Sequence, residues 1–339
     1  MSLQPSTLAD HPLAKKFQCL GPHQVITAVE TAGFACTGRL LSLNSYENRV
    51  YQVDVEDGPP VIAKFYRPGR WSVDTIEDEH DFLFELADEG IAVSKPLVID
   101  DGYSLDTLDG EAKGIHYALF EKVAGRLDDE PDVEKLYQLG RSIAAIHAVG
   151  ERRHAQHRQT LGVDAWGQPA LDAIVGSGLL PHTMQAAYSD IAQTIFEHVT
   201  SGLEMVPLHR IHGDCHHSNL MWDDTTPVYF DFDDMVHGPA VQDIWMLAPS
   251  SDENGRIRRS KIIEGYRESR DFHTQWLDLV EPLRALRIIR YSGWIAMRWH
   301  DPMFQKTFAH VLTDEFWADE IRQLRDIVCC IERPVEIGN

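Results

Sequence analysis

The spacing of apolar residues in the first third of the chain changes from a helical period to a period of two. Residues 21–33 have the helical spacing and predict one short helix. The apolar runs that follow predict five strands, at residues 41–43, 50–55, 61–65, 96–100 and 115–122. Because short, turn-rich segments separate these runs, we expect one antiparallel sheet.

Residues 74–90 return to the helical period, with an apolar stripe that contains Ile76 and Leu83. Glu79 lies on the same stripe, where a carboxylate is costly unless it is paired. Lys64 lies inside the third predicted strand, either at a sheet edge with its ammonium in solvent or buried with a partner. If Lys64 is buried, Glu79 is the partner that we expect.

Almost everything after residue 126 has the helical period. The predicted helices cover residues 133–150, 184–200, 257–268, 277–300 and 313–330. Asp132 is a candidate N-cap for the first of them, and Gly150 is its expected end. We interpret the charged connector around His154 as a solvated loop. The chain therefore predicts an α+β fold of two lobes, an antiparallel five-stranded N-lobe with one key helix at residues 1–122 and a mainly helical C-lobe at residues 123–339.

Charge and composition narrow the functional classes. The 339 residues carry a net charge of -22, which argues against a protein that binds the phosphate backbone of nucleic acids. The five cysteines have no regular spacing, so we expect reduced thiols and a cytoplasmic location. The most apolar stretch, residues 283–299, is interrupted by four arginines, and we expect no membrane association. We also expect a monomer.

The candidate chemistry lies between Arg210 and Asp234. Asp214 and Asn219 are five residues apart, which is the separation between the base aspartate and the metal-binding asparagine of kinase catalytic loops. Asp231 directly follows an apolar run, where its carboxylate can hold a metal ion. Oxygen ligands in this arrangement suit one hydroxyl and one or two Mg²⁺ ions, so the pattern predicts phosphoryl transfer.

The histidines and the cysteine of this segment have a second interpretation. His212, Cys215, His216 and His217 are close enough in the sequence to suggest a zinc site. Against this, zinc ligands normally share a helix face or form paired knuckles, and no second cluster follows. We therefore interpret His212 as a buried anchor of the loop. Cys215 is better explained by packing, because a neighbouring carboxylate disfavours its thiolate.

Two further carboxylates flank the motif. Asp233 would share a side of a continuing strand with Asp231, so either could face a metal ion. We prefer Asp231, because it comes directly after the apolar run. Asp243 opens a predicted apolar helix, where it could accept backbone N–H bonds from the catalytic loop. We expect Asp243 to support the site without reacting.

Two loops of the N-lobe complete the candidate site. Residues 44–48 form either a plain polar hairpin turn or a loop whose backbone N–H groups and Ser45 hydroxyl contact phosphates. This loop has no glycine, so it is not a G-x-G-x-x-G loop. Residues 121–125 follow an apolar strand and are the expected hinge between the lobes. There, backbone groups of Glu121 and Val123 could hydrogen-bond the edge of an adenine.

With these residues in order, the chain resembles the aminoglycoside phosphotransferase and choline kinase superfamily of protein-kinase-like folds. The segments L-N-S-Y-E-N-R-V-Y and G-P-A-V-Q-D-I-W-M-L extend the similarity over nearly the whole chain, to a branch of bacterial Ser/Thr protein kinases. The resemblance implies that Asp214 is the catalytic acceptor of the substrate hydroxyl proton. It also implies that Asn219 and Asp231 hold Mg²⁺.

The same resemblance implies a function and an ATP site. Ser45 would contact an ATP phosphate, and Lys64 with Glu79 would orient the α- and β-phosphates. The implied enzyme is an ATP- and Mg²⁺-dependent Ser/Thr protein kinase in a bacterial stress response. Two alternatives stay open. One is a kinase for small alcohols such as amino-alcohols, homoserine or aminoglycosides, and the other is a pseudokinase scaffold that binds ATP without turnover.

Overall fold

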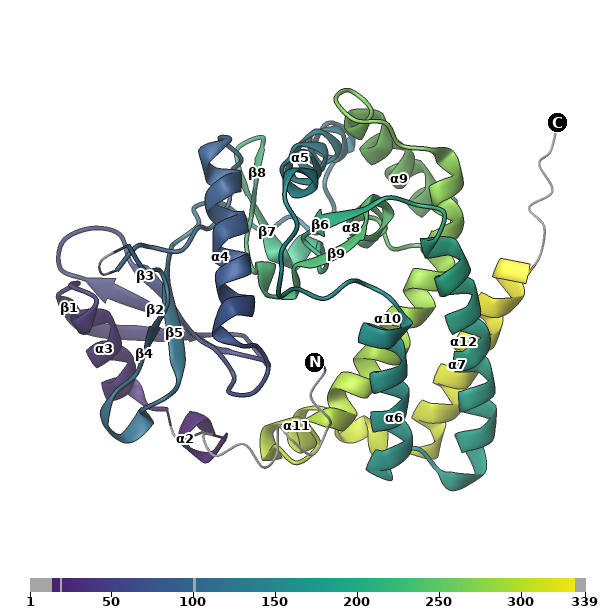
Figure 1. Cartoon of the computed structure of the whole chain (residues 1–339), viewed down its shortest axis with the longest axis horizontal. Helices are drawn as coiled ribbons and strands as arrows, with labels where there is room; N and C mark the ends of the chain where they lie inside the picture. The colour runs from purple at the N-terminus through teal and green to yellow at the C-terminus, as the bar shows by residue number, and fades with distance from the viewer. Residues whose placement is uncertain (1–13, 19, 100–101, 333–339) are drawn as a thin grey trace.

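The computed structural model describes residues 14–18, 20–99 and 102–332 and shows a molecule of two lobes (Figure 1). The smaller lobe is built on one antiparallel sheet with the strand order β1-β2-β3-β5-β4. Its strands are β1 (Cys36–Leu43), β2 (Arg49–Val55), β3 (Val61–Phe65), β4 (Asp106–Thr107) and β5 (His116–Glu121). The predicted fold class, a five-stranded antiparallel sheet followed by a mainly helical part, is confirmed.

The strand expected at residues 96–100 was placed wrongly. Pro96 makes only an isolated bridge with Phe120, and its nitrogen has no hydrogen to donate to a ladder. Residue 100 lies outside the described residues. The edge of the sheet is formed instead by β4, where the carboxylate of Asp106 accepts a hydrogen bond of 2.8 Å from the hydroxyl of Tyr117 on β5.

Helix α4 (Val73–Asp88) lies between the sheet and the helical lobe (Figure 1). Ser72 caps its N-terminus, because the Ser72 side chain accepts a hydrogen bond from the backbone N–H of Thr75. The buried apolar residues of α4, among them Ile76 and Leu83, belong to the same hydrophobic cluster as the C-terminal helices. The sheet has a separate cluster that α2 (Ala14–Gln18) and α3 (Pro22–Thr31) complete. Helix α4 therefore carries its inward side chains toward the junction of the lobes.

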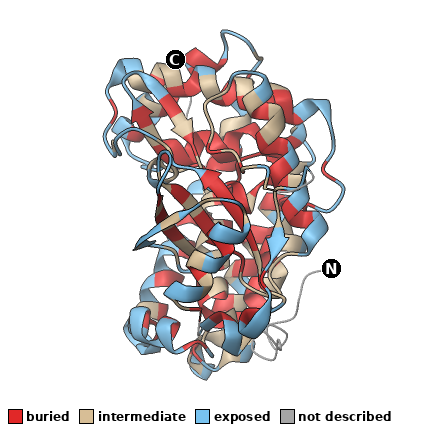
Figure 2. Ribbon diagram, turned by 90° about the vertical axis from the view of Figure 1, so that its left-hand side faces the viewer, coloured by how far each residue is buried: buried red, intermediate tan, exposed pale blue. Residues whose placement is uncertain are grey.

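The larger lobe is mainly helical, and buried residues run through its interior (Figure 2). Its helices are α5 (Val133–Arg152), α6 (Gln168–Ser177), α7 (His182–Leu203), α8 (Ala240–Leu247), α9 (Glu253–Tyr266), α10 (Val280–Met297), α11 (Pro302–Thr307) and α12 (Asp314–Glu332). The five predicted helices correspond to α5, α7, α9, α10 and α12. Helices α6 and α11 were not predicted, because segments of ten and six residues are too short for a clear period. No helix in the described ranges is long and apolar enough to cross a membrane.

Gly150 does not end α5, which continues to Arg152. A Cβ atom at residue 150 would lie 2.1 Å from the carbonyl oxygen of Arg210 on β6 (Leu208–Ile211), so the glycine lets the helix pack directly on this strand. The predicted N-cap is correct, since the side chain of Asp132 accepts a hydrogen bond of 2.9 Å from the backbone N–H of Lys135. A glycine that looked like a stop signal is thus a packing position.

Two small antiparallel pairs carry the motif between Arg210 and Asp234. Strand β6 pairs with β9 (Val236–Pro239), and β7 (Leu220–Asp223) pairs with β8 (Thr226–Tyr229). The predicted catalytic loop, residues 212–219, runs from β6 to β7, and the acidic turn, residues 230–235, runs from β8 to β9. Both segments therefore leave the same side of this small structure, next to the junction of the lobes (Figure 1).

Candidate active site

A cavity of about 300 Å³ lies where the sheet meets the helical lobe. Much of its wall is apolar, including Ile62, Leu83 and Phe120, as is common for cofactor pockets. The lining also contains all of the residues expected to contact a nucleotide, together with one expected metal ligand: Ser45, Lys64, Glu79, Glu121, Val123 and Asp231. The structure thus brings together residues from five separate segments of the sequence.

Lys64 on β3 is buried, with 6% of its surface exposed, so it is not an edge residue in solvent. Its ammonium nitrogen lies 3.4 Å from Oε1 of Glu79, 3.3 Å from Oδ1 of Asp231 and 3.2 Å from Oδ1 of Asp233. Burial opposes a charge on Lys64, but the carboxylates of Asp233 and Glu79 outweigh it and raise the pKa of Lys64. The predicted ion pair with Glu79 is present, and Lys64 is a cation in the cavity wall.

Arg158 completes this cluster and was not predicted. It lies in the connector that we interpreted as a solvated loop, yet it is only 5% exposed. Its guanidinium donates to Oε2 of Glu79 at 3.0 Å and to the backbone oxygens of Thr75 and Asp233. The interpretation was wrong at this residue because Glu79 has two buried oxygens, of which Lys64 pairs with one. The local sequence around Arg158 carries no signal of this distant partner.

The two carboxylates that could face a metal ion have different surroundings. Asp233 is 4% exposed, forms a close ion pair with Arg70 and accepts a hydrogen bond of 3.1 Å from Nδ2 of Asn48. Burial alone would raise the pKa of Asp233, but the charges of Arg70 and Lys64 outweigh it and lower that pKa well below its ordinary value. Asp231 has half of its side chain exposed and adopts a left-handed φ of 60°. Asp231 is therefore the more accessible of the two.

Asp243 fixes the backbone of the catalytic loop from beneath. It is fully buried on α8 and accepts hydrogen bonds of 2.9 Å from the backbone N–H groups of His212 and Gly213. Its Oδ2 also lies 3.0 Å from Nε2 of His147. Gly213 has a φ of 83°, and a Cβ there would lie 2.3 Å from the carbonyl oxygen of Asp234, so this position requires glycine. The support expected of Asp243 is present.

The side chain of Asp214 is 21% exposed, and both of its carboxylate oxygens contact other side chains. Its Oδ2 lies 3.3 Å from Nε2 of His216 and 3.4 Å from Nδ2 of Asn219, and its Oδ1 lies 2.6 Å from a guanidinium nitrogen of Arg287 on α10. Burial alone would raise the pKa of Asp214, but the hydrogen bond with His216 and the charge of Arg287 outweigh it and hold the pKa well below its ordinary value. Arg287 was not among the predicted site residues.

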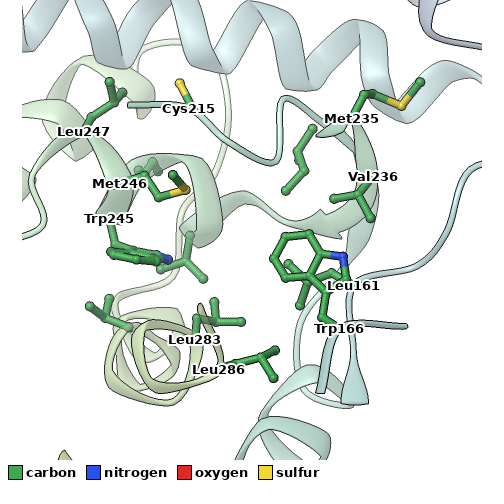
Figure 3. Packing of buried hydrophobic residues seen from close by; sticks show 14 of the residues in the cluster. Leu161, Trp166, Cys215, Met235, Val236, Trp245, Met246, Leu247, Leu283 and Leu286 are labelled. Carbon is green, nitrogen blue, oxygen red and sulfur yellow. The ribbon is translucent and has the colours of Figure 1, made fainter. Parts of the chain in front are cut away.

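The other polar groups of the catalytic loop face different partners. Nε2 of His212 lies 3.1 Å from the carbonyl oxygen of Phe230, and Nε2 of His217 lies 2.8 Å from that of Leu247. Cys215 lies among buried apolar side chains (Figure 3). Within residues 14–18, 20–99 and 102–332, no group of three or more His, Cys, Asp or Glu side chains is placed to hold a metal ion. The geometry gives no support to the zinc interpretation.

Asn219 and Asp231 fit Mg²⁺ by the chemistry of their donor atoms. Nδ2 of Asn219 donates to the backbone oxygen of Asp214 at 3.1 Å, and within the described ranges nothing donates to its amide oxygen. Mg²⁺ in nucleotide sites usually takes one or two protein oxygens and completes its shell with phosphates and water. A pair of one amide and one carboxylate therefore suits an ion that arrives with a nucleotide.

The loop of residues 44–48 is tied to the helical lobe through Glu47. Its carboxylate accepts hydrogen bonds of 2.7 Å from Nε1 of Trp294 and from the guanidinium of Arg298. Burial alone would raise the pKa of Glu47, but the charges of Arg298 and Arg70 outweigh it and, with a third arginine, lower that pKa to about 2. This anchoring is more than a plain hairpin turn needs. Glu47 was missed because its partners lie near the other end of the chain.

Ser45 and Asn48 shape the same loop from within. The hydroxyl oxygen of Ser45 accepts a hydrogen bond of 3.2 Å from the backbone N–H of Asn48. Asn48 is 5% exposed, and its amide oxygen accepts a bond of 3.1 Å from the backbone N–H of Arg67. The Ser45 hydroxyl is thus held at the cavity wall, where its contact with a phosphate stays a prediction.

The expected hinge follows β5. The backbone N–H of Glu121 donates to the carbonyl oxygen of Lys95 at 3.3 Å, and its carbonyl accepts a bond of 2.9 Å from the hydroxyl of Ser94. Val123 is half-buried in the cavity lining, and its backbone makes no hydrogen bond with any other described residue. Val123 therefore offers more free backbone groups to a base than Glu121 does.

The chain matches known proteins along most of its length. Residues 39–280 match the phosphotransferase enzyme family. A Salmonella typhimurium protein named serine/threonine protein kinase RdoA is 36% identical over 303 residues, which cover 89% of this chain and 90% of that protein. Stress response kinase A of Escherichia coli K12 is 34% identical over 302 residues, with 89% and 90% of the two chains covered.

A solved structure of the amicoumacin kinase hAmiN, in complex with AMP-PNP, Ca²⁺ and Ami, has a similar fold. The TM-score is 0.72 at 19% identity, and the superposition covers 93% of this chain and 96% of that one. At this level of identity the likeness concerns the fold alone. The residues of the site must carry the argument for its chemistry.

Proposed function

We propose, since the chain belongs to the phosphotransferase enzyme family, that it transfers the γ-phosphoryl group of ATP to Ser or Thr hydroxyls of a protein substrate. The observation that carries this proposal is the cation Lys64, held in the wall of a nucleotide-sized cavity by Glu79, with Asp214 on the adjacent catalytic loop. Such a layout supplies positioning and charge, which are the main requirements of phosphoryl transfer.

The cavity suits ATP from one end to the other. Backbone groups of Val123 face an adenine edge, with Glu121 as the neighbouring hinge residue, while Ser45 and Lys64 contact the phosphates. Asn219 and Asp231 would hold Mg²⁺, which supplies charge neutralisation to the phosphate oxygens when it is bound. A fixed ammonium at Lys64 pre-organises the site, because it needs no reorientation as charge develops.

Asp214 receives the acceptor. The hydroxyl oxygen attacks the γ-phosphorus, the bond from that phosphorus to the β,γ-bridging oxygen breaks, and ADP leaves. Asp214 accepts the hydrogen bond of the hydroxyl and takes its proton as the new oxygen–phosphorus bond forms. The low pKa of Asp214 keeps it ionised, so it is ready to accept a hydrogen bond at neutral pH.

A protein acceptor is favoured by the names of the curated relatives, one of which is a Ser/Thr protein kinase and another a stress response kinase. We accordingly place the reaction in a bacterial stress response in the cytoplasm. The four cysteines in the described ranges are free thiols, in keeping with that compartment. The second candidate is a small-alcohol kinase, which the net charge of -22 favours if the substrate is a cation.

The proposal is tested with labelled ATP and Asp214→Asn. We expect the wild type to label protein substrates or itself, and the variant to lose about 10²- to 10⁴-fold in transfer while nucleotide binding is retained. Asp223→Asn is the matched control, because Asp223 is an exposed aspartate on β7. Equal transfer by wild type and Asp214→Asn overturns the assignment.

Two other outcomes separate the alternatives. Labelling of a small alcohol from a panel without any labelled protein identifies a small-molecule kinase. Magnesium-dependent ATP binding without turnover on any acceptor identifies a pseudokinase. In both cases the residues that line the cavity keep their predicted contacts with ATP, which Lys64→Met weakens.

A further inference from the structure

Arg287 is the one feature of the acceptor side that the proposed reaction does not explain. It lies on α10, and its guanidinium nitrogen is 2.6 Å from Oδ1 of Asp214. The other oxygen of Asp214, Oδ2, already faces His216 and Asn219. An incoming hydroxyl therefore has Oδ1 as its place of contact, and Arg287 occupies that place. The acceptor and Arg287 compete for one oxygen atom.

Arg287 is free to leave this position. A third of its side chain is exposed, and its only hydrogen bond within the described ranges is a long one of 3.8 Å to the sulfur of Met246. Arg290, one turn further along α10, is different: its guanidinium stacks 3.6 Å from the ring centre of Trp166 and donates to Asp234 at 2.8 Å. Arg290 is a structural residue, whereas Asp214 is the only ion-pair partner of Arg287 in the part of the chain that the structure describes.

A displaced Arg287 needs another anion, because a partly buried guanidinium without a partner is costly. Two carboxylates on or facing α10 are already paired. Glu281 forms a close ion pair with Arg284, and Asp234 faces both Arg70 and Arg290. The new partner therefore comes from a bound ligand, either the acceptor or the γ-phosphate of ATP.

We propose that Arg287 determines substrate specificity by exchanging Asp214 for an acidic side chain of the acceptor protein, next to the Ser or Thr that is phosphorylated. This inference rests on the proposed function, and it names the substrate class as an acidic peptide segment. A neutral segment leaves Arg287 on Asp214 and has to compete with it for Oδ1. The chain carries a net charge of -22, which repels an acidic segment. The local positive charge of Arg287 offsets this repulsion at the site.

The test uses two Ser-containing peptides that differ only in having Asp or Asn beside the serine. For the wild type we expect kcat/KM to be about tenfold higher for the acidic peptide. Arg287→Ala removes this preference and raises the rate on the neutral peptide, because the competitor for Oδ1 is gone. Arg287→Glu favours a third peptide, with Lys at the same position. Arg284→Ala is the matched control, since Arg284 lies three residues earlier on α10 and pairs with Glu281, and it keeps the wild-type preference.

The outcomes that overturn the inference are equally defined. An unchanged preference in Arg287→Ala shows that Arg287 does not contact the acidic residue. An equal loss on both peptides together with a higher KM for ATP shows that Arg287 contacts the γ-phosphate. Thermal unfolding of each variant separates these results from misfolding.

A binding experiment distinguishes failure of the proposed function from failure of the inference about Arg287. If no peptide is labelled, fluorescence anisotropy of the acidic and neutral peptides is measured with a non-hydrolysable ATP analogue present. Tighter binding of the acidic peptide that Arg287→Ala abolishes supports the inference without any turnover. If only small alcohols are phosphorylated, serine and ethanolamine, which differ by a carboxylate, take the place of the peptides. Equal use of the two by wild type overturns the role of Arg287.

Discussion

The nucleotide side and the acceptor side of the candidate site are held by different means. On the nucleotide side, Glu47 is buried among arginines, and Lys64 has three carboxylates around it. On the acceptor side, Asp243 holds the backbone of the loop by hydrogen bonds, but the carboxylate of Asp214, the proposed base, is covered by the partly exposed Arg287. The first side is formed before any ligand arrives. In the reaction that we propose, the second is completed only when a substrate displaces Arg287 from Asp214.

The difference fits the two ligands. ATP is the same molecule in every turnover, so a rigid site lowers the entropy lost on binding. The protein acceptor that we propose must be selected among many, and a movable charge at Arg287 would let the correct one complete the site. A loop without glycine can serve the phosphates because its shape comes from Glu47 and Asn48, which are bonded to residues outside the loop.

The sharpest test of the nucleotide side is Lys64→Met. We expect kcat/KM to fall by about a hundredfold or more, because a fixed cation at the phosphates is lost. The free energy of unfolding should fall by only about 2 kcal/mol, since Glu79 keeps Arg158 and Asp233 keeps Arg70. Steady-state kinetics and urea unfolding measure the two effects. A large loss of stability would mean that the cluster depends on Lys64 alone.

Arg158→Ala should show the opposite balance. The free energy of unfolding should fall by about 3–5 kcal/mol, because Glu79 loses a partner in a buried cluster and several backbone oxygens lose their donor. Lys64 remains in the cavity wall, so kcat of the folded fraction should change much less than in Lys64→Met. Urea unfolding measures the loss of stability, and steady-state kinetics at saturating ATP measure kcat. A similar loss of kcat in Arg158→Ala and Lys64→Met would contradict this prediction.

Glu47→Gln probes the anchored loop through pH. The fall in the pKa of Glu47 from 4.5 to about 2 corresponds to about 3 kcal/mol of stability. Because the folded pKa is the lower one, this contribution is complete above pH 4.5 and is lost as the pH falls toward 2. We expect wild type to exceed the variant by about 3 kcal/mol at pH 7 and by about 2 kcal/mol at pH 3.5. A gap that does not shrink would show that charge is not what anchors the loop.

The smallest expected effect belongs to Cys215 beneath the acceptor side. Burial raises the pKa of its thiol, and the carboxylates of Asp243 and Asp214 raise it further, so it is a poor nucleophile. Mild peroxide should leave Cys215 unmodified while the exposed Cys329 is oxidised, as mass spectrometry can show. Cys215→Ser should cost about 1 kcal/mol. Ready oxidation of Cys215 would mean that the catalytic loop opens far enough to expose this buried thiol.

Short-range patterns were enough to predict much of this molecule. The change of period predicted the sheet and the long helices, and an acid on the apolar stripe of α4 predicted the pair of Lys64 with Glu79. The position of Asp243 at the beginning of an apolar segment predicted its bonds to the catalytic loop. Glu79 and Asp243 each stand in an apolar context that conflicts with their charge, and pairing is one solution of that conflict; for Lys64 the sequence left a solvent-exposed sheet edge open as the other.

The parts that could not be predicted depend on pairs that are distant in the sequence. Glu47 and Arg298 are separated by 251 residues, and Arg158 and Glu79 by 79. Arg287 is one of several arginines on a helix, and only the crossing of α10 over the catalytic loop selects it for Asp214. Periodicity states which side of an element is buried. It does not state which element lies opposite.

Helix α10 also sets a limit on how this protein can change. Arg287 contacts Asp214, Arg290 contacts Asp234 and Trp294 contacts Glu47, so about two helical turns, roughly 10 Å, connect three parts of the candidate site. One inserted residue between residues 287 and 294 would rotate the later contacts by about 100° around the helix axis. Loops elsewhere in the chain can grow or shrink during evolution, but this segment must keep its length.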